Sequence, residues 1–585
     1  MSRVVIVSVL AAVGIAVTSA PALAASTPLF PGTTYEDTLQ FTPHGPVAIR
    51  VVRGPRPVGL FRLRTVLSNE TVLGRETVSS MQRRLGSQAT MVGVNGDFSR
   101  FADGNPSGIL LRDGVLIAPP NSQRSSAGFG LDGTLDVRRI RFLGTWRGSG
   151  QRRSLNVLND APGKNGIALF TSEYGRTTPR IAGSYSVVLA PFPASVPNAD
   201  LVAPVATAAR NDGVRIAPGT AVLVARGNAA QKLQAEAQIG ATVTLRLILQ
   251  PDWPTVSDAV GGGPVLVRDG RPVYQANEAF EVSVIAPRHP RTAIGQLADG
   301  RTLMVVVDGR QSGYSVGMTT FEMAQTMTRL GAVRAMQLDG GGSSTLAFDG
   351  VVLNRPSDGR ERPISTAVML QYYGVYARPP LEAVVSPNGD GAAETQELSF
   401  KVVRPSTTTA TLTAPDGTIA WQEADIAREP GEYDVAFPPA TLTPEGEPAS
   451  PLPPAEGRWT LTVSALDDQG LGSTATRRFT VNSTLASLRV APVRVVVRPS
   501  GGRADIRWTQ SRAGRVKVTI ETPEGVVVRT VSNGVLGAGA QAVVWDGRGA
   551  NRKPVGTGRY VVRVTATNEL GAVSLGGGIV VRFSR

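Results

Sequence analysis

The stretch from His289 to Thr345 limits the possible folds of this 585-residue chain more than any other segment. Two apolar runs within it, residues 302–307 and 333–338, are each followed directly by an aspartate-glycine pair, at Asp308 and at Asp339. Short apolar runs that stop at such a pair are typical of buried strands. We therefore expect each strand to bring one aspartate to a loop at its carboxyl end.

A helix is predicted between these two strands. Thr319 and Glu322 have the spacing of a capping box, and apolar residues follow at helical intervals up to Gly331, a residue suited to the helix end. A strand–helix–strand crossover favours parallel pairing and puts ligands at the carboxyl ends of the strands. The pattern predicts that both aspartates lie at one edge of a mixed sheet.

Glycine and serine follow the second aspartate without a break. Gly340, Gly341 and Gly342 allow close approach of the backbone, so that successive amides can point at an anion, and Ser343 and Ser344 add hydroxyl donors. The lysine of a nucleotide-binding loop and the spacing of a dinucleotide-binding loop are both missing. Gly261-Gly262-Gly263-Pro264 supplies a second tight corner.

Several segments around these motifs resemble the phosphodiester glycosidase family. They are HPRTAIG (289–295), VVDGRQSGYSVGMTTFEMAQTMTRLGA (from Val306), MQLDGGGSSTL (from Met336), VNGDFSRFADGNPSGILLRDG (94–114) and VGGGPVLVRDG (260–270). The resemblance covers roughly residues 70–376 and is most specific in the LDGGGSST block. One departure is Asn95-Gly96-Asp97-Phe98-Ser99, where the family commonly has two phenylalanines after the glycines. The substrate subsite is expected to differ there.

The resemblance implies an enzyme that cleaves a sugar-1-phosphodiester at the glycosidic bond. Such a reaction needs charge stabilisation for the phosphate leaving group and a carboxylate for the oxocarbenium-like sugar. We expect Asp308, Asp339 and His289 to be catalytic. The residues expected to bind substrate are Asn95, Asp97, Gly262, Arg291, Thr292, Gly340, Gly341, Gly342, Ser343 and Ser344.

Each of the main site residues also has a structural interpretation. His289 is one of two histidines; it either exchanges protons near neutral pH or is simply a hydrogen-bonded structural residue. Arg291 is suited to a bidentate grip on phosphate, or to a salt bridge with one of the aspartates. Asp308 and Asp339 are either functional acids or turn formers.

Two other functions stay open. A metal-dependent phosphodiesterase would use Asp97, Asp308 and Asp339 as ligands, although paired-metal sites usually recruit several histidines. A glycan-binding or adhesion protein without catalysis would suit the C-terminal half. We expect no cofactor, with a divalent metal such as calcium left open at Ser386–Gly391, where a plain turn at a domain entry is the other interpretation.

Composition narrows the partners and the compartment. The chain has no cysteine, which excludes disulfides and thiol nucleophiles, and its net charge is +14. Only five of its 60 basic residues are lysines, the arginines are scattered and aromatics are 5%, so nucleic-acid binding is not expected. A basic surface would concentrate anionic cell-wall polymers. Residues 1–24 have the charged start, short apolar core and Ala22-Leu23-Ala24 ending of a signal peptide, which predicts secretion without a membrane anchor.

The composition changes after Tyr376. Arg378-Pro379-Pro380 is interpreted as a linker, and two similar segments, 410–417 and 517–525, indicate a repeat of short strands. The second copy resembles the immunoglobulin-like domain of the flagellar hook-capping protein family. We therefore expect an α+β catalytic domain with few helices at 28–377, then two all-β sandwiches at 382–482 and 486–585.

Overall fold

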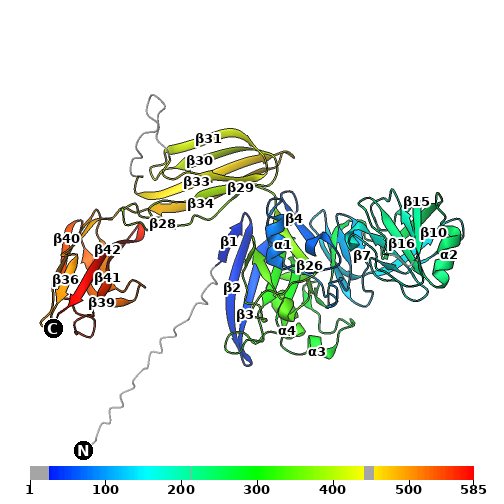
Figure 1. Cartoon of the computed structure of the whole chain (residues 1–585), viewed down its shortest axis with the longest axis horizontal. Helices are drawn as coiled ribbons and strands as arrows, with labels where there is room; N and C mark the ends of the chain where they lie inside the picture. The colour runs from blue at the N-terminus through cyan, green and yellow to red at the C-terminus, as the bar shows by residue number, and fades with distance from the viewer. Residues whose placement is uncertain (1–25, 211–212, 440–453, 585) are drawn as a thin grey trace, which may run out of the picture.

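The computed structural model describes residues 26–210, 213–439 and 454–584, and this part of the chain consists mostly of strands (Figure 1). The expected signal peptide lies outside the described residues, and so do residues 440–453 of the stretch 434–454, whose proline and glutamate content predicts a long loop. Among the described residues there are four α-helices: α1 (Val78–Leu85), α2 (Asn228–Glu236), α3 (Val282–Ile285) and α4 (Thr320–Arg329). The helical spacing of Thr77, Val78, Met81 and Leu85 predicts α1, and the capping box predicts α4, whereas α2 and α3 were not expected.

An eight-stranded sheet carries the central motif. Its strand order is β1-β2-β3-β22-β21-β23-β19-β20. The bounds are β1 (Ser26–Phe30), β2 (Thr33–Thr42), β3 (Gly45–Gly54), β22 (Thr302–Val307), β21 (Arg291–Leu297), β23 (Ala332–Gln337), β19 (Val265–Arg268) and β20 (Arg271–Pro272). The N-terminal segment from residue 27 thus extends this sheet, since β3 pairs directly with β22.

The expected parallel pairing in a mixed sheet is wrong for this sheet. The strands β22 and β23 are each antiparallel to β21, which lies between them, and every other pair in the sheet is antiparallel as well. The reason is a tight turn at Asp299-Gly300, which folds β21 back onto β22 before the helix crosses over. The strands β22 and β23 still run in the same direction, so both of their carboxyl ends reach one edge.

A second sheet packs face to face against the first. It has the order β25-β24-β5-β26-β4, with β25 (Val351–Val352), β24 (Leu346–Phe348), β5 (Thr90–Asn95), β26 (Thr366–Tyr372) and β4 (Phe61–Leu67). Between the sheets, Met304 and Val306 of β22 share a core with Val92 and Val368. The outer face of the first sheet is covered by α4 and that of the second by α1, which gives four layers.

A smaller sheet joins this body to a second lobe. The joining sheet has the order β7-β6-β18-β8-β9, with β7 (Val115–Ala118), β6 (Leu110–Arg112), β18 (Val256–Gly261), β8 (Ser125–Gly130) and β9 (Leu135–Arg139). The lobe has its own core around Trp146 and Leu245. The sheet of this lobe has eight strands in the order β11-β10-β17-β15-β14-β16-β13-β12. The bounds are β11 (Arg153–Leu155), β10 (Arg141–Arg147), β17 (Thr242–Gln250), β15 (Asp200–Arg210), β14 (Ser184–Leu189), β16 (Ala221–Arg226), β13 (Ile167–Thr171) and β12 (Val157–Leu158).

Two β-sandwiches of matching topology follow. The first has sheets β27-β29-β32 and β28-β34-β33-β30-β31; the second has β35-β37-β40 and β36-β42-β41-β38-β39. The bounds are β27 (Tyr376–Ala377), β28 (Val384–Val385), β29 (Leu398–Val402), β30 (Ser406–Thr413), β31 (Ile419–Arg428), β32 (Gly431–Val435), β33 (Gly457–Asp467), β34 (Gly472–Val481), β35 (Leu485–Ala491), β36 (Arg494–Val497), β37 (Ala504–Gln510), β38 (Gly514–Glu521), β39 (Val527–Leu536), β40 (Gly539–Trp545), β41 (Gly558–Asn568) and β42 (Gly571–Phe583).

The matching strand orders make β27 the first strand of the first sandwich. β27 pairs with β29 as β35 pairs with β37. The segment Arg378-Pro379-Pro380 therefore lies inside this sandwich, between its first two strands. The expected boundary at 377 separates β27 from the sheet to which it belongs.

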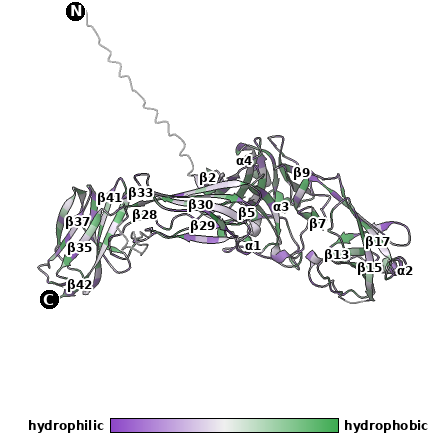
Figure 2. Ribbon diagram, turned by 90° about the horizontal axis from the view of Figure 1, so that it is seen from above, coloured by the Kyte–Doolittle hydropathy of each residue, from purple (hydrophilic) through white to green (hydrophobic). Residues whose placement is uncertain are grey.

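The turn Ser386–Gly391 connects the two sandwiches. Asn388 donates from Nδ2 to the carbonyl oxygen of Ser574, and Asp390 accepts at Oδ2 from the amide of Gly576 at 2.9 Å. The turn is thus a contact between domains. The molecule is elongated, with the second sandwich at one end and the lobe that carries α2 at the other (Figure 2). No helix in the described part is long and apolar enough to cross a membrane.

Candidate active site

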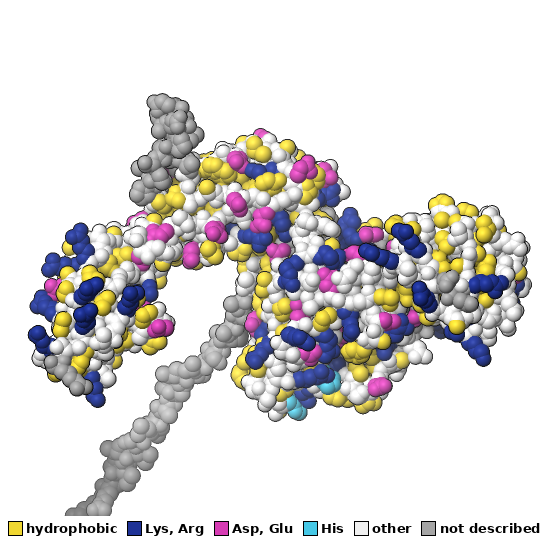
Figure 3. All heavy atoms as spheres, viewed as in Figure 1, with side chains coloured by type: hydrophobic (Ala, Val, Ile, Leu, Met, Phe, Trp, Pro, Cys, Tyr) yellow, Lys and Arg dark blue, Asp and Glu magenta, His cyan; other side chains and the backbone are white. Residues whose placement is uncertain are grey.

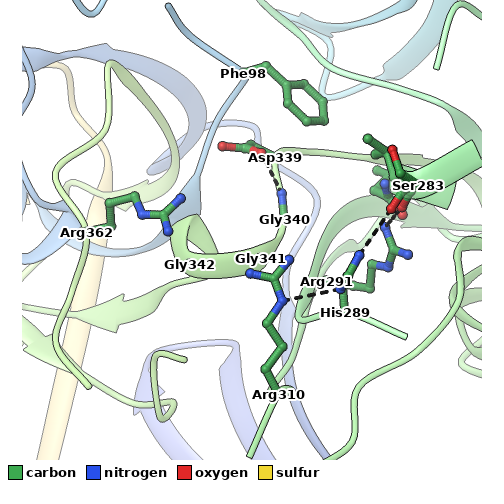
Figure 4. A pocket seen from close by; sticks show the side chains of 12 residues that line it. Phe98, Ser283, His289, Arg291, Arg310, Asp339, Gly340, Gly341, Gly342 and Arg362 are labelled. Atoms are coloured by element: carbon green, nitrogen blue, oxygen red, sulfur yellow. Dashed lines mark hydrogen bonds between the residues drawn. The ribbon is translucent and has the colours of Figure 1, made fainter. Parts of the chain in front are cut away.

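The edge at the carboxyl ends of β22 and β23 holds a pocket of about 200 Å³ (Figure 4). Asp339 follows β23, and His289 and Arg291 stand at the start of the neighbouring antiparallel strand β21. The lining residues are Phe98, Ser283, Val284, His289, Arg291, Arg310, Gln337, Asp339, Gly340, Gly341, Gly342 and Arg362. The central motif therefore converges on one cavity, as the sequence predicts for Asp339.

The Asp339 residue is fixed from three sides. Its carboxylate accepts from the amide of Gly340 at 2.8 Å and from the hydroxyl of Ser343. Its carbonyl oxygen accepts from Asn95 Nδ2 at 2.7 Å, and its amide donates to the carbonyl oxygen of Gly96. Burial raises the pKa of Asp339 to about 6, although the hydrogen bonds from Ser343 and Gly340 favour the ionised form.

A second aspartate is buried beside it. Asp97 is 4% exposed, and its Oδ1 accepts from the amide of Phe98. Its Oδ2 is buried without a hydrogen-bond partner in the described part of the chain. A Cβ atom at Gly261 would lie 2.2 Å from that oxygen and one at Gly108 2.7 Å from it, so only glycine leaves room for this carboxyl. Burial, and to a smaller degree the charge of Asp339, raises the pKa of Asp97 to about 7.

Asp308 does not line the pocket. Its side chain is 1% exposed and accepts hydrogen bonds from Asn354 Nδ2, the Arg355 amide and the Tyr314 hydroxyl, with Arg50 Nη2 at 3.7 Å. Both carboxylate oxygens are engaged in these contacts. The structure therefore pairs Asp339 with Asp97, and it places Asp308 in a network that fixes neighbouring loops.

Arg291 lines the pocket, but its donors are engaged elsewhere. It is 1% exposed and donates to the carbonyl oxygens of Met318, Val284 and Pro287, each at 2.8 Å. Burial lowers its pKa to about 10. These contacts hold α3 against the body, so the guanidinium fork is not free to grip a phosphate in this structure.

His289 also connects neighbouring groups. Arg310 Nε donates to His289 Nδ1 at 3.3 Å, which leaves Nε2 as the protonated nitrogen facing the Ser283 carbonyl oxygen at 3.2 Å. Burial lowers the pKa of His289, and the two arginines beside it act in the same direction. The imidazole is therefore neutral, and both of its nitrogens are occupied.

Arg310 and Arg362 are the cations whose roles the sequence did not indicate. They reach the glycine turn from two sides in Figure 4, and a Cβ atom at Gly341 would lie 3.2 Å from the Arg310 guanidinium nitrogens. Arg310 has a φ of 58°, a conformation that non-glycine residues adopt at a cost and often at functional sites. Arg362 is partly neutralised by Asp358, at 2.6 Å. The only sequence signal for Arg310 was its position directly after Asp308-Gly309.

The glycine turn serves mainly the protein itself. The amide of Gly340 binds the Asp339 carboxylate, and that of Gly341 donates to the Pro290 carbonyl oxygen at 2.9 Å. The expected row of free amides for an anion is therefore wrong for these two glycines. The carboxylate of Asp339 takes the Gly340 amide because the backbone of Asp339 holds it beside the turn, and the Pro290 carbonyl oxygen takes the Gly341 amide.

The other predicted binding residues lie behind the pocket wall. Thr292 donates from Oγ1 to Asn95 Oδ1 at 2.8 Å, and both side chains are buried. Gly262 packs under β23, where a Cβ atom would lie 2.7 Å from Met336. Ser344 Oγ is buried without a partner in the described residues. Asn95, Thr292 and Gly262 position the pocket residues and do not line the pocket.

A wall of two aromatic rings and one arginine closes the pocket on the side of Phe98. The rings of Phe98 and Phe280 have centroids 5.6 Å apart, and Arg124 lies 5.1 Å and 4.5 Å from them. The charge of Arg124 favours ionisation of both Asp97 and Asp339. On the floor, Gln337 Nε2 is a buried donor without a partner among the described residues, which is typical of a site built for a ligand.

Comparison with known proteins supports this region as the functional centre. Residues 195–371 match the phosphodiester glycosidase family. All of the lining residues except Phe98 fall in this range. Residues 496–569 match the FlgD Ig-like domain, in the second sandwich.

Individual relatives match over short segments. The prophage-derived uncharacterized protein YomE of Bacillus subtilis is 39% identical over 108 residues, which is 18% of this chain and 16% of the relative. The N-acetylglucosamine-1-phosphodiester alpha-N-acetylglucosaminidase of Mus musculus is 35% identical over 121 residues, 19% of this chain and 23% of the enzyme. This chain therefore spans less than a quarter of the length of either protein.

One solved structure shares the fold over a longer region. A hypothetical protein from Synechocystis aligns with a TM-score of 0.51 at 24% identity, covering 60% of this chain and 64% of that one. This likeness concerns the fold alone.

Proposed function

We propose that this protein is a hydrolase that cleaves a sugar-1-phosphodiester at the glycosidic bond. The observation that carries the proposal is the pocket that the half-buried Asp339 shares with Arg310 and Arg362, whose guanidinium groups lie on either side of the glycine turn. The similarity of residues 195–371 to the phosphodiester glycosidases supports the same reaction. The distant match to the mouse glucosaminidase agrees with a carbohydrate phosphodiester as the substrate class.

In this proposal the acid of the pocket and its cations have separate roles in the reaction. Ionised Asp339 stabilises positive charge at the anomeric carbon, next to the Phe98 ring, on which a sugar face can stack. Arg310 and Arg362 neutralise the leaving phosphate, which is a weak base and needs charge compensation more than protonation. Asp97, whose raised pKa of about 7 leaves it partly protonated at neutral pH, lies behind Asp339 and carries less than a full second charge there.

His289 and Arg291 position other groups in this scheme. His289 orients Arg310 through Nδ1, and Arg291 holds the segment that forms one wall. The scheme replaces Asp308 by Asp97 as the partner acid, because Asp308 is engaged in its own network.

The metal-dependent phosphodiesterase is the less favoured reading. Within 26–210, 213–439 and 454–584, no group of three or more histidine, cysteine, aspartate or glutamate side chains is placed to hold a metal ion. Asp308, one of its three expected ligands, is engaged by Asn354, Arg355 and Tyr314.

Product analysis on nitrophenyl-phosphoryl sugars tests the proposal. We expect free sugar and nitrophenyl phosphate, with activity that survives chelators. Sugar-1-phosphate and nitrophenol would identify the phosphodiesterase, and no turnover on any sugar would leave the non-catalytic glycan-binding protein. Arg310→Ala should lower kcat/KM about 100-fold or more, as expected for loss of one charge-stabilising donor. Arg360→Ala is the matched control, because Arg360 is a nearby arginine that does not line the pocket.

We further propose that the protein is exported and acts on an envelope or extracellular phosphoglycan. The signal-like pattern of residues 1–24 supports export, and Lys and Arg side chains spread over the face seen in Figure 3 suit an anionic polymer. N-terminal sequencing of protein from the culture medium tests the export, with a start near Ala25 expected. Retention of the full chain inside cells would contradict it.

A further inference from the structure

The charge of the chain is distributed very unevenly between the two sandwiches. The sequence of the second sandwich, residues 485–585, contains 16 lysines and arginines and five aspartates and glutamates, a net charge of +11. That of the first sandwich, residues 376–484, contains seven basic and 15 acidic residues, a net charge of −8. The face drawn in Figure 3 shows the same contrast, with Lys and Arg gathered on the second sandwich and Asp and Glu over the first.

Most cations of the second sandwich have no acidic partner. Among its described lysines and arginines, only Arg503, Arg512 and Arg563 form ion pairs. Arg489 and Arg507 lie directly opposite each other on β35 and β37, and both are exposed. Like charges in such cross-strand positions destabilise a sheet. Charge that the fold does not use, and that costs it stability, indicates a surface for an anionic partner.

The cations are densest on two adjacent segments, residues 498–503 and 546–553, which we call the distal loops. Their only acid is Asp546, and their cations are Arg498, Arg503, Arg548, Arg552 and Lys553. The two loops lie side by side, because the amide of Gly502 donates to the Asp546 carbonyl oxygen at 2.8 Å and Arg548 Nη2 donates to the Pro499 carbonyl oxygen at 2.7 Å. The Asp546 carboxylate accepts from the Arg548 amide in its own turn.

The distal loops lie at the end of the second sandwich that points away from the first. The strand β41 begins at Gly558, shortly after the second loop, and ends at Asn568. There Asn568 Oδ1 accepts from Nδ2 of Asn482, in the first sandwich, at 3.2 Å. An 11-residue strand is roughly 35 Å long, and this length separates the basic loops from the junction with the acidic sandwich.

The composition of the distal loops favours phosphate groups as the anions. Four of the five cations are arginines, whose planar guanidinium groups bind two phosphate oxygens at once. Neither loop contains an aromatic residue, whereas proteins that bind single-stranded nucleic acids stack the bases on aromatic rings. Several cations on one small surface suit a partner with repeated phosphates, because each contact releases further counterions from a polymer.

We propose that the distal loops bind a phosphodiester-linked polymer and thereby attach the enzyme to the glycan that carries its substrate. The choice of a phosphodiester polymer rests on the proposed function, whereas the basic surface itself does not. The negative first sandwich repels the same polymer, so binding is confined to the tip of the second sandwich. The second sandwich is then an anchoring domain, and cleavage takes place in the pocket of the catalytic region.

Binding of soluble poly(glycerol phosphate) to the intact chain tests the proposal. A triple variant with Arg498→Gln, Arg552→Gln and Lys553→Gln removes three loop charges whose side chains make no polar contact with other described residues. At about 0.15 M salt we expect Kd to weaken about tenfold or more. The slope of log Kd against log salt should fall by about 2, because three fewer contacts release fewer counterions.

A matched control removes the same net charge from another part of the molecule. Arg141→Gln, Arg147→Gln and Arg180→Gln together change three exposed arginines in the lobe that carries α2. This variant should bind the polymer as tightly as wild type, since charges far from the loops are screened at this salt concentration. Both triple variants should keep the wild-type Tm and the wild-type kcat/KM on nitrophenyl-phosphoryl sugars, because neither set of residues lines the pocket.

The results separate this inference from the proposed function. Equal losses of affinity in the two triple variants, or no binding by wild type, would overturn the docking surface and leave the glycosidase intact. Equal or tighter binding of polygalacturonate or of duplex DNA would overturn the choice of a phosphodiester glycan as the partner. If no sugar substrate is cleaved but polymer binding depends on the distal loops, the proposed function fails and the docking surface stands.

Discussion

At the scale of single residues, the two pocket-edge aspartates Asp339 and Asp97 carry the electrostatics of the site. Asp97 is buried and Asp339 is half-buried beside it, and loss of solvent raises the pKa of each above that of an ordinary aspartate. Asp308, by contrast, has the contacts of a structural acid.

Asp339→Asn should abolish turnover, because the amide cannot stabilise a positive charge at the anomeric carbon. The measurement is kcat/KM with a melting curve, and Tm should stay within a few degrees of wild type. Wild-type kcat/KM should rise with pH through about 6, as Asp339 ionises. Substantial activity in the asparagine variant would remove Asp339 from the mechanism.

Asp308→Asn provides the matched comparison. Because Asp308 accepts from Asn354, Arg355 and Tyr314, its loss should lower the free energy of unfolding by about 1–3 kcal/mol and leave folded protein active. Loss of turnover at unchanged Tm would restore Asp308 to the reacting centre, as the sequence first suggested.

The raised pKa of Asp97 predicts that the stability of the folded protein depends on pH. Its pKa is about 7 in the folded protein against an ordinary value of 3.8, so the folded state retains a proton that the unfolded chain has lost. The stabilising contribution of protonated Asp97 to the free energy of unfolding is fully present below pH 4 and is lost as the pH rises through 7. Compared with wild type, Asp97→Asn should gain stability between pH 4 and pH 8, on the order of 2–4 kcal/mol. A stability difference independent of pH, measured by urea unfolding, would contradict the raised pKa.

At the scale of elements, α3 is the least anchored wall of the site. None of its four residues is buried, and Val282 is 72% exposed. Arg291 holds the carbonyl oxygen of Val284 in α3 and that of Pro287 just after it, and His289 contacts the carbonyl oxygen of Ser283. A helix this short has little stability of its own, so these contacts determine its position.

Arg291→Lys should loosen this wall. One ammonium group cannot span the carbonyl oxygens of Met318, Val284 and Pro287 at once. We expect faster hydrogen exchange and faster proteolysis within residues 275–288, together with a raised KM. Arg288→Lys is the control, since Arg288 forms an ion pair with Glu322 outside the pocket. Unchanged exchange in Arg291→Lys, with weaker binding of inorganic phosphate, would instead support a direct grip on phosphate.

At the scale of the whole molecule, the first sandwich and the catalytic region share a strand. Tyr376 packs on Phe348 of the catalytic region, with centroids 6.2 Å apart, while its strand pairs with β29. Lys401 Nζ of the sandwich donates to the Gly86 carbonyl oxygen of the catalytic region at 3.1 Å. The two parts are therefore joined by sheet, core and polar contacts.

Truncation distinguishes this arrangement from a simple linker. A chain that ends at 377 keeps β27 without its sheet and exposes Val375 and Ala377, both buried in the sandwich core. It should melt several degrees lower than a chain that ends at 483, which keeps the whole sandwich, and the longer chain should match the intact protein in activity and Tm. Equal Tm for the two truncated chains would show that the sandwich adds nothing to the catalytic region.

The sequence alone determined the local structure of the central motif. The apolar runs of β22 and β23, the capping box of Thr319 and Glu322, and the aspartate after each strand all depend on neighbouring residues. These local rules placed Asp339 at the sheet edge. The repeat of segments 410–417 and 517–525 predicted two sandwiches for the same reason, since alternation of apolar residues is a local property.

Only the tertiary structure decided which side chains meet and which stay free. The antiparallel β21 between β22 and β23 depends on pairing over long sequence separations, which no local pattern encodes. Asp97 joins Asp339 because β5 and β23 lie in facing sheets, and Arg291 and His289 are occupied because α3 folds back over them. Arg362 reaches the glycine turn from a loop, and loop positions follow from packing. Chemistry at a site depends on distance and burial, and both arise only when remote segments are brought together.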